Sequence, residues 1–178
     1  MTPECSRVRI ILGIDPGSRI TGFGVIRMGR RAEYLHCGCI TVGDLSFPAR
    51  LCGIFDGLTA IVQEFAPVEA AIEKVFMNRN VESALKLGQA RGAAMVAVAK
   101  LGLPVHEYSP NSIKQAIVGR GHADKAQIQH MVKALLNLAE IPPPDAADAL
   151  AIAICHAHTQ QGLAAVATAR RARAGRYS

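Results

Sequence analysis

The sequence has few aromatic residues and no cysteine motif typical of a disulfide-rich or zinc-binding protein. It contains five Phe, three Tyr and no Trp in 178 residues. Its five cysteines are scattered and include no CxxC pair, and His156 and His158 beside Cys155 do not complete a zinc-ligand spacing. We therefore interpret the cysteines as free, buried thiols of a reducing compartment rather than as disulfides or metal ligands.

Long hydrophobic runs are also missing. The first ten residues, MTPECSRVRI, lack the apolar core of a secretion signal. The longest helical apolar run, Ala93–Ala99, is closed by Arg91 and Lys100, whereas a membrane span needs about 20 apolar residues. We therefore expect a cytoplasmic protein with no membrane anchor.

Hydrophobic residues and positive charge are both plentiful. Half of the residues are hydrophobic, which is enough to bury the core of one domain. We predict a single domain over residues 1–160, followed by a basic, disordered C-terminal tail over residues 161–178. The net charge of +6 suits a polyanionic partner, either nucleic acid or an acidic membrane surface. Many soluble domains are mildly basic, however, so charge alone does not identify the partner.

Apolar runs bounded by turn residues predict five strands. The first three are separated by short turns, which indicates antiparallel hairpins. They are expected at Val8–Ile14, Gly22–Met28 and Ala32–Val42. Two more are expected at Val68–Val75 and Pro104–Tyr108. The almost continuous apolar run of the fourth is typical of a buried parallel strand, so the sheet should be mixed.

Helical spacing of apolar residues fills the intervals between and after these strands. Helices are expected at Phe47–Phe65, at Val81–Leu101, from Ser109 onward, from the 119–125 loop to Leu138, and from Asp145 to about Thr159. The sequence therefore predicts an α/β fold with a five-stranded mixed sheet flanked by helices.

Four acidic side chains stand at the ends of apolar segments. Asp15 follows the first strand, and Glu73 lies near the end of the fourth. Asp145 and Asp148 are three residues apart at the start of the last helix, so they share one face. A carboxylate at such a depth is costly unless it is paired or ligates a cation. Oxygen ligands suit Mg²⁺ or Mn²⁺, and two such ions about 4 Å apart could activate a water molecule and stabilise the leaving oxygen of a phosphodiester.

Each acid also has an ordinary structural explanation. Asp15 precedes a Pro-Gly pair and could initiate a turn. Glu73 could mark the point where a strand meets solvent. Asp145 is a natural N-cap after three prolines, and Asp148 is a first-turn acid favoured by the helix dipole. These explanations do not say why apolar segments repeatedly end in acids, so the four acids together favour a metal site.

Five segments resemble those of one enzyme family, in the family's order. They are Ile11–Arg19 (ILGIDPGSR), Thr21–Ile26 (TGFGVI), Ala71–Met77 (AIEKVFM), Ser83–Gly92 (SALKLGQARG) and Asp145–Ala153 (DAADALAIA). On these motifs the chain resembles the RuvC family, the crossover junction endodeoxyribonucleases that resolve Holliday junctions. The resemblance extends over about residues 9–158. The Gly-Ile-Asp-Pro-Gly-Ser opening is fairly specific, and the combination is highly specific.

The resemblance implies an RNase H-like fold and two Mg²⁺ ions per active site, with Mn²⁺ able to substitute. It implies paired symmetric nicks in two strands of a four-way junction, leaving 5′-phosphate and 3′-hydroxyl ends, in DNA recombination and repair. It also implies a homodimer and cooperation with the RuvA–RuvB branch-migration complex. Gly88 and Gly92 in the long helix would permit close approach of a partner backbone.

The resemblance also assigns roles to residues. The family's metal-binding acids match Asp15, Glu73, Asp145 and Asp148, and some relatives carry His at one position of the last cluster. The family's junction-contacting aromatic matches Phe76, and its two basic residues near the active site match Lys114 and Lys125.

The residues assigned to DNA contact also have alternatives in their own chemistry. An exposed Phe76 could stack on an unpaired base, but it could equally pack in the core. Lys114 and Lys125 could neutralise phosphates, but each could equally lie on a solvated helix face.

Three other functions compete with a junction endonuclease. An RNase H proper or an RNA-processing relative would share the fold, but the Lys86–Gly92 segment and the final Asp-Ala-Ala-Asp argue for RuvC. An ATP-binding domain of the actin or Hsp70 type also begins with a strand and an Asp-x-Gly loop, but it needs a second comparable domain that 178 residues cannot supply. A non-catalytic DNA-binding module would explain the basic charge but not the acids.

Overall fold

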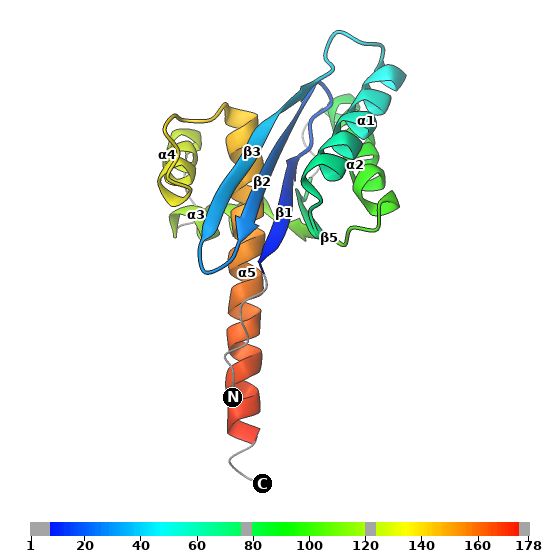
Figure 1. Cartoon of the computed structure of the whole chain (residues 1–178). Coiled ribbons are helices and arrows are strands. Elements are labelled where there is room, and N and C mark those ends of the chain that lie inside the picture. Colours follow the sequence, from blue (N-terminus) through cyan, green and yellow to red (C-terminus); the bar gives the residue numbers. More distant parts are fainter. Residues whose placement is uncertain (1–7, 76–79, 120–123, 175–178) are drawn as a thin grey trace.

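A five-stranded mixed sheet forms the centre of the protein (Figure 1). The computed structural model describes residues 8–75, 80–119 and 124–174, with side chains to residue 166. The strands are β1 (Arg9–Asp15), β2 (Ile20–Met28), β3 (Ala32–Thr41), β4 (Glu69–Glu73) and β5 (Val105–Tyr108). Their order is β3-β2-β1-β4-β5. The first three strands pair antiparallel, while β4 pairs parallel with both β1 and β5, which confirms the predicted mixed sheet.

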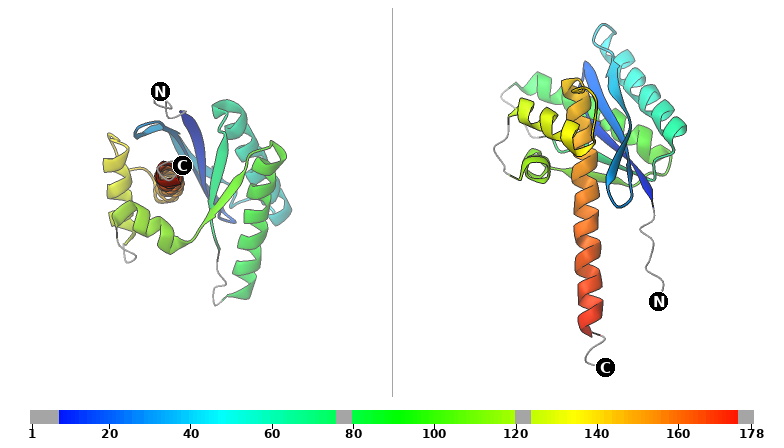
Figure 2. Two further views of the ribbon diagram at one scale, coloured as in Figure 1. Left: turned by 90° about the horizontal axis from the view of Figure 1, so that it is seen from below. Right: turned by 60° about the vertical axis from the view of Figure 1, so that its left-hand side comes forward.

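Helices cover both faces of the sheet, as Figure 2 shows. They are α1 (Phe47–Phe65), α2 (Val81–Lys100), α3 (Pro110–Val118), α4 (Lys125–Leu135) and α5 (Pro144–Ala174). One core lies between the sheet and α1 and α2, and a second lies between the sheet and α3, α4 and α5. Successive residues of β1 alternate between these cores: Ile11 joins the α5 side and Leu12 the α1–α2 side. Side chains of alternate strand residues therefore converge beneath α5.

Glycines in β1 and β2 let α5 lie directly on the sheet. A Cβ atom at Gly13 would overlap the carbonyl oxygen of Ala149, and one at Gly22 would overlap that of Asp145. A side chain at either glycine would therefore push the helix away. The close contact fixes the first turns of α5 over the ends of β1 and β2, and those turns carry Asp145 and Asp148.

Side-chain caps fix where the two short helices begin. The Ser109 side chain accepts a hydrogen bond from the Ser112 N–H, and α3 then starts with a proline at its first position. Asp124 and Gln127 form a capping box at the start of α4. These caps set the positions from which Lys114 of α3 and Lys125 of α4 project.

The last helix is longer than the sequence analysis predicted. We expected it to end near Thr159 and residues 161–178 to be disordered, but α5 continues to Ala174 and extends well beyond the sheet (Figure 1). The apolar periodicity stops where the helix leaves the core, and exposed Leu163 and Val166 lie in this extension. Ala and Arg have high helix propensity without burial, so the helix continues where the core does not.

Two smaller expectations are also corrected. The Cys37, Cys39, Cys52 and Cys155 thiols of the described segments are free, as predicted, but only Cys155 is buried. Cys39 lies on the edge strand β3 and Cys52 on a solvent-facing side of α1. The helix expected to reach Leu138 ends at Leu135, shortly before Asn137 adopts a positive φ of 50°. No described helix is long and apolar enough to cross a membrane.

Candidate active site

A cavity of about 260 Å³ opens beside the C-terminal ends of β1 and β4. Three acids and two lysines from five elements line it: Asp15, Glu73, Asp148, Lys114 and Lys125. Pro110, Ile113, Ile128 and Ile152 complete the wall. The structure therefore gathers charged residues that are far apart in the sequence around one space large enough for small ligands.

Parallel pairing brings the first two acids together. Ile14 of β1 stands opposite Ile72 of β4, so the residues that follow, Asp15 and Glu73, end neighbouring strands at the same edge of the sheet. Alternation along each strand also turns both toward the α5 side, because Ile11 and Ala71 belong to the core on that side. The expectation that these two acids converge is met by the sheet register.

The two acids of α5 are not equivalent in position. Asp148 lines the cavity, whereas Asp145 is not among the residues that line it. Asp145 still lies close enough for its charge to raise the pKa of Asp15. Asp148 is therefore the helix acid most directly placed toward the cavity, with Asp145 one turn before it.

Burial and mutual repulsion disfavour the ionised acids. Burial, followed by the charges of Glu73, Asp148 and Asp145, raises the pKa of Asp15 from 3.8 to about 8, although Lys125 opposes the shift. Burial also raises the pKa of Glu73, and the charge of Asp148 adds to it. The pKa of Asp148 rises as well, chiefly through burial. A divalent cation would favour the charged forms of all these carboxylates.

The two lysines neutralise only part of this negative charge. Lys125 Nζ lies 3.9 Å from Asp148 Oδ2, which is too long for a hydrogen bond. Its side chain is 79% exposed. Lys114 and Lys125 both lower the pKa of Glu73 and of Asp148. Both ammonium groups therefore stand beside the acids with the capacity to contact a further anion.

The donor set matches the chemistry of hard divalent cations. Carboxylate oxygens from two strands and one helix face the cavity region, and oxygen ligands are those that Mg²⁺ and Mn²⁺ prefer. Three acids and only two lysines line the cavity, so the lysines do not balance the charge of the fully ionised acids. The residues thus fit a metal site. Phe76, the predicted aromatic contact, lies outside the described residues.

One contributor was not recognised from the sequence. Arg91 of α2 donates from Nε to the main-chain oxygen of Glu73 at 3.0 Å, and its guanidinium also pairs with Glu107 of β5. This contact holds the end of β4, and with it Glu73, against α2. Arg91 lies in a segment that carried the family resemblance, but its spacing gives no sign of a partner in β4.

Comparisons with known proteins agree on one family. The sequence profile described as crossover junction endodeoxyribonuclease RuvC matches residues 11–156. The RuvC protein of Marinobacter nauticus is 59% identical over 169 residues, covering 94% of this chain and 97% of that protein. The RuvC protein of Shewanella baltica is 56% identical over 170 residues, covering 94% and 98%.

Solved structures give the same result. Thermus thermophilus RuvC in complex with a Holliday junction substrate matches with a TM-score of 0.81 and 36% identity, covering 86% of this chain and 96% of that one. A yeast mitochondrial Holliday junction resolvase matches with a TM-score of 0.60 and 13% identity, covering 88% and 82%, which bears on the fold alone. These matches confirm the predicted RNase H-like fold.

Proposed function

We propose, from the premise that this chain belongs to the RuvC family of crossover junction endodeoxyribonucleases, that it resolves Holliday junctions in DNA recombination and repair. The observation that carries the proposal is that one cavity collects Asp15, Glu73 and Asp148 beside two lysines. The proposed reaction is phosphodiester hydrolysis that leaves 5′-phosphate and 3′-hydroxyl ends. The proposal places the protein in the cytoplasm.

The four acids are proposed to hold two Mg²⁺ ions, with Mn²⁺ able to substitute. When bound, such ions lower the pKa of the attacking water and neutralise charge on the leaving oxygen. The protein contributes the fixed positions of Asp15 and Glu73 on neighbouring strands and of Asp145 and Asp148 on one helix. The apolar wall formed by Ile113, Ile128 and Ile152 limits water around the acids, which strengthens their attraction for cations.

Lys114 and Lys125 are proposed to contact DNA phosphates. Each lines the cavity beside the acids, so a phosphate held there would lie next to the reacting centre. Phe76 follows β4 in the sequence by three residues and is proposed to stack on an unpaired base of the junction. The net charge of +6 favours the encounter with DNA.

A homodimer is proposed as the active assembly, because paired nicks require two active sites. The supporting feature is a stripe on α2 formed by Val81, Leu85, Gly88, Gly92 and Val96. Val81 and Leu85 are each 63% exposed. Within the described part of the chain, nothing lies within 4 Å of a Cβ position at Gly88 or Gly92. The stripe recurs at helical spacing and would let a second helix approach closely. The RuvA–RuvB complex is proposed as a further partner.

The test uses a synthetic four-way junction and Mg²⁺. We expect symmetric nicks across the junction, no cleavage of plain duplex, and loss of nicking in Asp15→Asn. Sedimentation should show a dimer, and Leu85→Glu should give monomers that no longer nick the two strands in concert. Cleavage of RNA–DNA hybrids without junction cleavage would instead identify an RNase H.

A further inference from the structure

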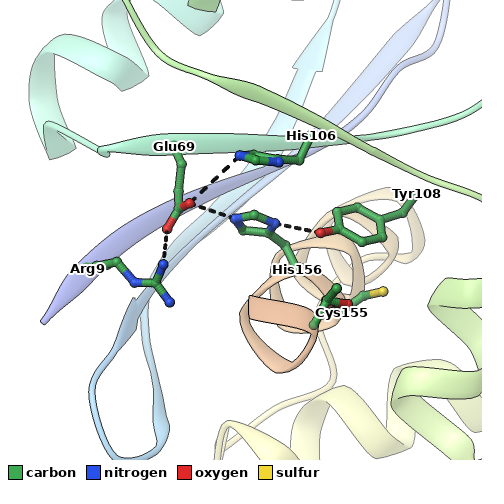
Figure 3. A network of polar contacts seen from close by, with 7 residues as sticks. Arg9, Glu69, His106, Tyr108, Cys155 and His156 are labelled. Carbon is green, nitrogen blue, oxygen red and sulfur yellow. Dashed lines mark hydrogen bonds and ion pairs between the residues drawn. The ribbon is translucent and has the colours of Figure 1, made fainter. Parts of the chain in front are cut away.

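A second group of metal-ligand side chains lies at the opposite end of β4 from Glu73. It consists of Glu69, the first residue of β4, His106 of β5 and His156 of α5 (Figure 3). One ligand atom from each residue lies within 4.8 Å of the other two. Three elements that are far apart in the sequence therefore present a carboxylate and two imidazoles to the same point.

Of the two histidines, His156 lies closer to Glu69. His156 Nε2 lies 2.9 Å from Glu69 Oε2. Even so, this buried nitrogen has no partner among the described residues with the geometry of a hydrogen bond. An imidazole nitrogen and a carboxylate oxygen at this distance can both ligate one metal ion.

His106 completes the group from the solvent side. Its Nε2 lies 3.9 Å from Glu69 Oε2, and its ring centroid lies 4.5 Å from that of His156. The His106 side chain is 36% exposed, whereas that of His156 is fully buried. The group is thus closed on the side of the core and reachable through His106.

Neighbouring residues hold the atoms of the ligands that do not face this point. The hydroxyl group of Tyr108 lies 2.7 Å from His156 Nδ1, and Arg9 Nη1 lies 3.1 Å from Glu69 Oε1. Metal-bound histidines commonly use their second ring nitrogen in such a contact, which orients the ring. Arg9 contacts Glu69 Oε1, so the carboxylate can bind a metal ion through Oε2.

We propose that Glu69 Oε2, His106 Nε2 and His156 Nε2 form a binding site for a divalent transition-metal ion of the zinc class. Two imidazoles and one carboxylate are a ligand set that Zn²⁺ favours, whereas Mg²⁺ and Ca²⁺ prefer oxygen alone.

The proposed role of the ion is to brace α5 against the sheet. Its ligands come from the strand that carries Glu73 and the helix that carries Asp148. Glu69 and Glu73 are about 13 Å apart along β4, and Asp148 and His156 are about 12 Å apart along α5. An ion at one end of this strand–helix pair would therefore fix the spacing of the acids at the other end.

The site is tested by titrating the metal-free, full-length chain with Co²⁺ at neutral pH and displacing it with Zn²⁺. We expect a visible absorption band typical of a nitrogen-ligated ion, lost as one equivalent of Zn²⁺ binds. Glu69→Gln and His106→Ala should each weaken Zn²⁺ binding by more than about tenfold. Both positions are favoured over His156 because a change at a fully buried histidine could unfold the protein.

Two controls separate this site from other sources of metal binding. Asp15→Asn removes a carboxylate at the far end of the strand–helix pair and should leave Zn²⁺ affinity unchanged. His130→Ala removes an exposed histidine of α4 and should also leave it unchanged. Zn²⁺ should raise the Tm of the wild type and of both controls, but not that of His106→Ala. Wild-type affinity in either Glu69→Gln or His106→Ala, or loss of the nitrogen-ligated site in Asp15→Asn, would overturn the proposal.

Discussion

The two ends of β4 present metal-ligand side chains of opposite character on the same face of the sheet. At the C-terminal end, Glu73 joins other carboxylates and two lysines around an open cavity. At the N-terminal end, Glu69 faces two imidazoles in a largely buried network. One strand and one helix thus contribute to two different sets of side chains. Carboxylates and lysines line a cavity at one end, whereas one carboxylate and two imidazoles lie together at the other.

Removing the charge of Asp15 should have the largest effect on junction cleavage. The effect should be confined to the site at the C-terminal end of β4. We expect Asp15→Asn to reduce junction cleavage by about a thousandfold or more, equivalent to about 4 kcal/mol of transition-state stabilisation. The Tm should not fall, because burial and like charges already disfavour the ionised Asp15. Single-turnover cleavage and thermal unfolding measure the two effects. Cleavage within tenfold of the wild type would exclude Asp15 from the reaction.

A substitution at Gly13 should weaken the sites at both ends of β4. Gly13 lies in mid-strand beneath α5, and a Cβ there would overlap the backbone of Ala149. We expect Gly13→Ala to destabilise the fold by about 1–3 kcal/mol and to weaken both junction cleavage and Zn²⁺ binding. Urea unfolding measures the first effect.

Gly162, in the part of α5 that lies beyond the sheet, offers a control. Nothing among the described residues lies within 4 Å of a Cβ position there, so Gly162→Ala should stabilise α5 by up to about 1 kcal/mol. Equal changes in the free energy of unfolding for Gly13→Ala and Gly162→Ala would contradict the close packing of α5 on β1.

Stability should depend on pH at the acidic end. The folded-state pKa of Asp15, about 8, lies above its ordinary value of 3.8, so the folded chain binds this proton more tightly than the unfolded chain. Asp15 therefore adds to the free energy of unfolding in full below about pH 3.8, and this contribution is lost as pH rises through about 8. Thermal unfolding between pH 5 and about pH 9, without divalent cations, should show a steeper loss in the wild type than in Asp15→Asn. Adding Mg²⁺ should reduce the difference.

The lysines should have the smallest effect. Lys125 is exposed and 3.9 Å from Asp148, so Lys125→Ala should weaken junction binding only a few-fold and lower the salt-dependence slope by about one. Binding measured in a salt series by fluorescence anisotropy tests this. Lys100→Ala, at the last residue of α2, serves as the matched control. An unchanged slope in Lys125→Ala would mean that its ammonium does not contact phosphate.

Local patterns in the sequence predicted most of the fold and the acidic site. Apolar runs and turn residues located each strand to within about two residues, and strand ends located Asp15 and Glu73. Two features were not predicted, for different reasons. Arg91 reaches the backbone of Glu73 across the sheet edge. The end of α5 depends on helix propensity outside the core, which apolar periodicity does not register.

The Glu69 cluster was missed for a related reason. The spacing of His156 and His158 matches no local zinc motif, but the structure combines His156 with residues of β4 and β5. The sheet register that brings Glu69 and His106 together follows from the pairing of two parallel strands, in which Ala71 stands opposite His106. Parallel pairing joins segments separated by a crossover helix, so no short motif encodes it.

The glycine contacts beneath α5 also decide when activity arises during synthesis. The strands that supply Asp15 and Glu73 emerge early, but Asp145 and Asp148 belong to the last helix, which must dock on β1 and β2. Contacts between such distant segments form slowly, because closing a long loop costs entropy before packing compensates it. A nascent chain therefore has Asp15 and Glu73 in place before Asp145 and Asp148 dock. If the four acids act together as proposed, hydrolysis begins only after α5 has settled on the sheet.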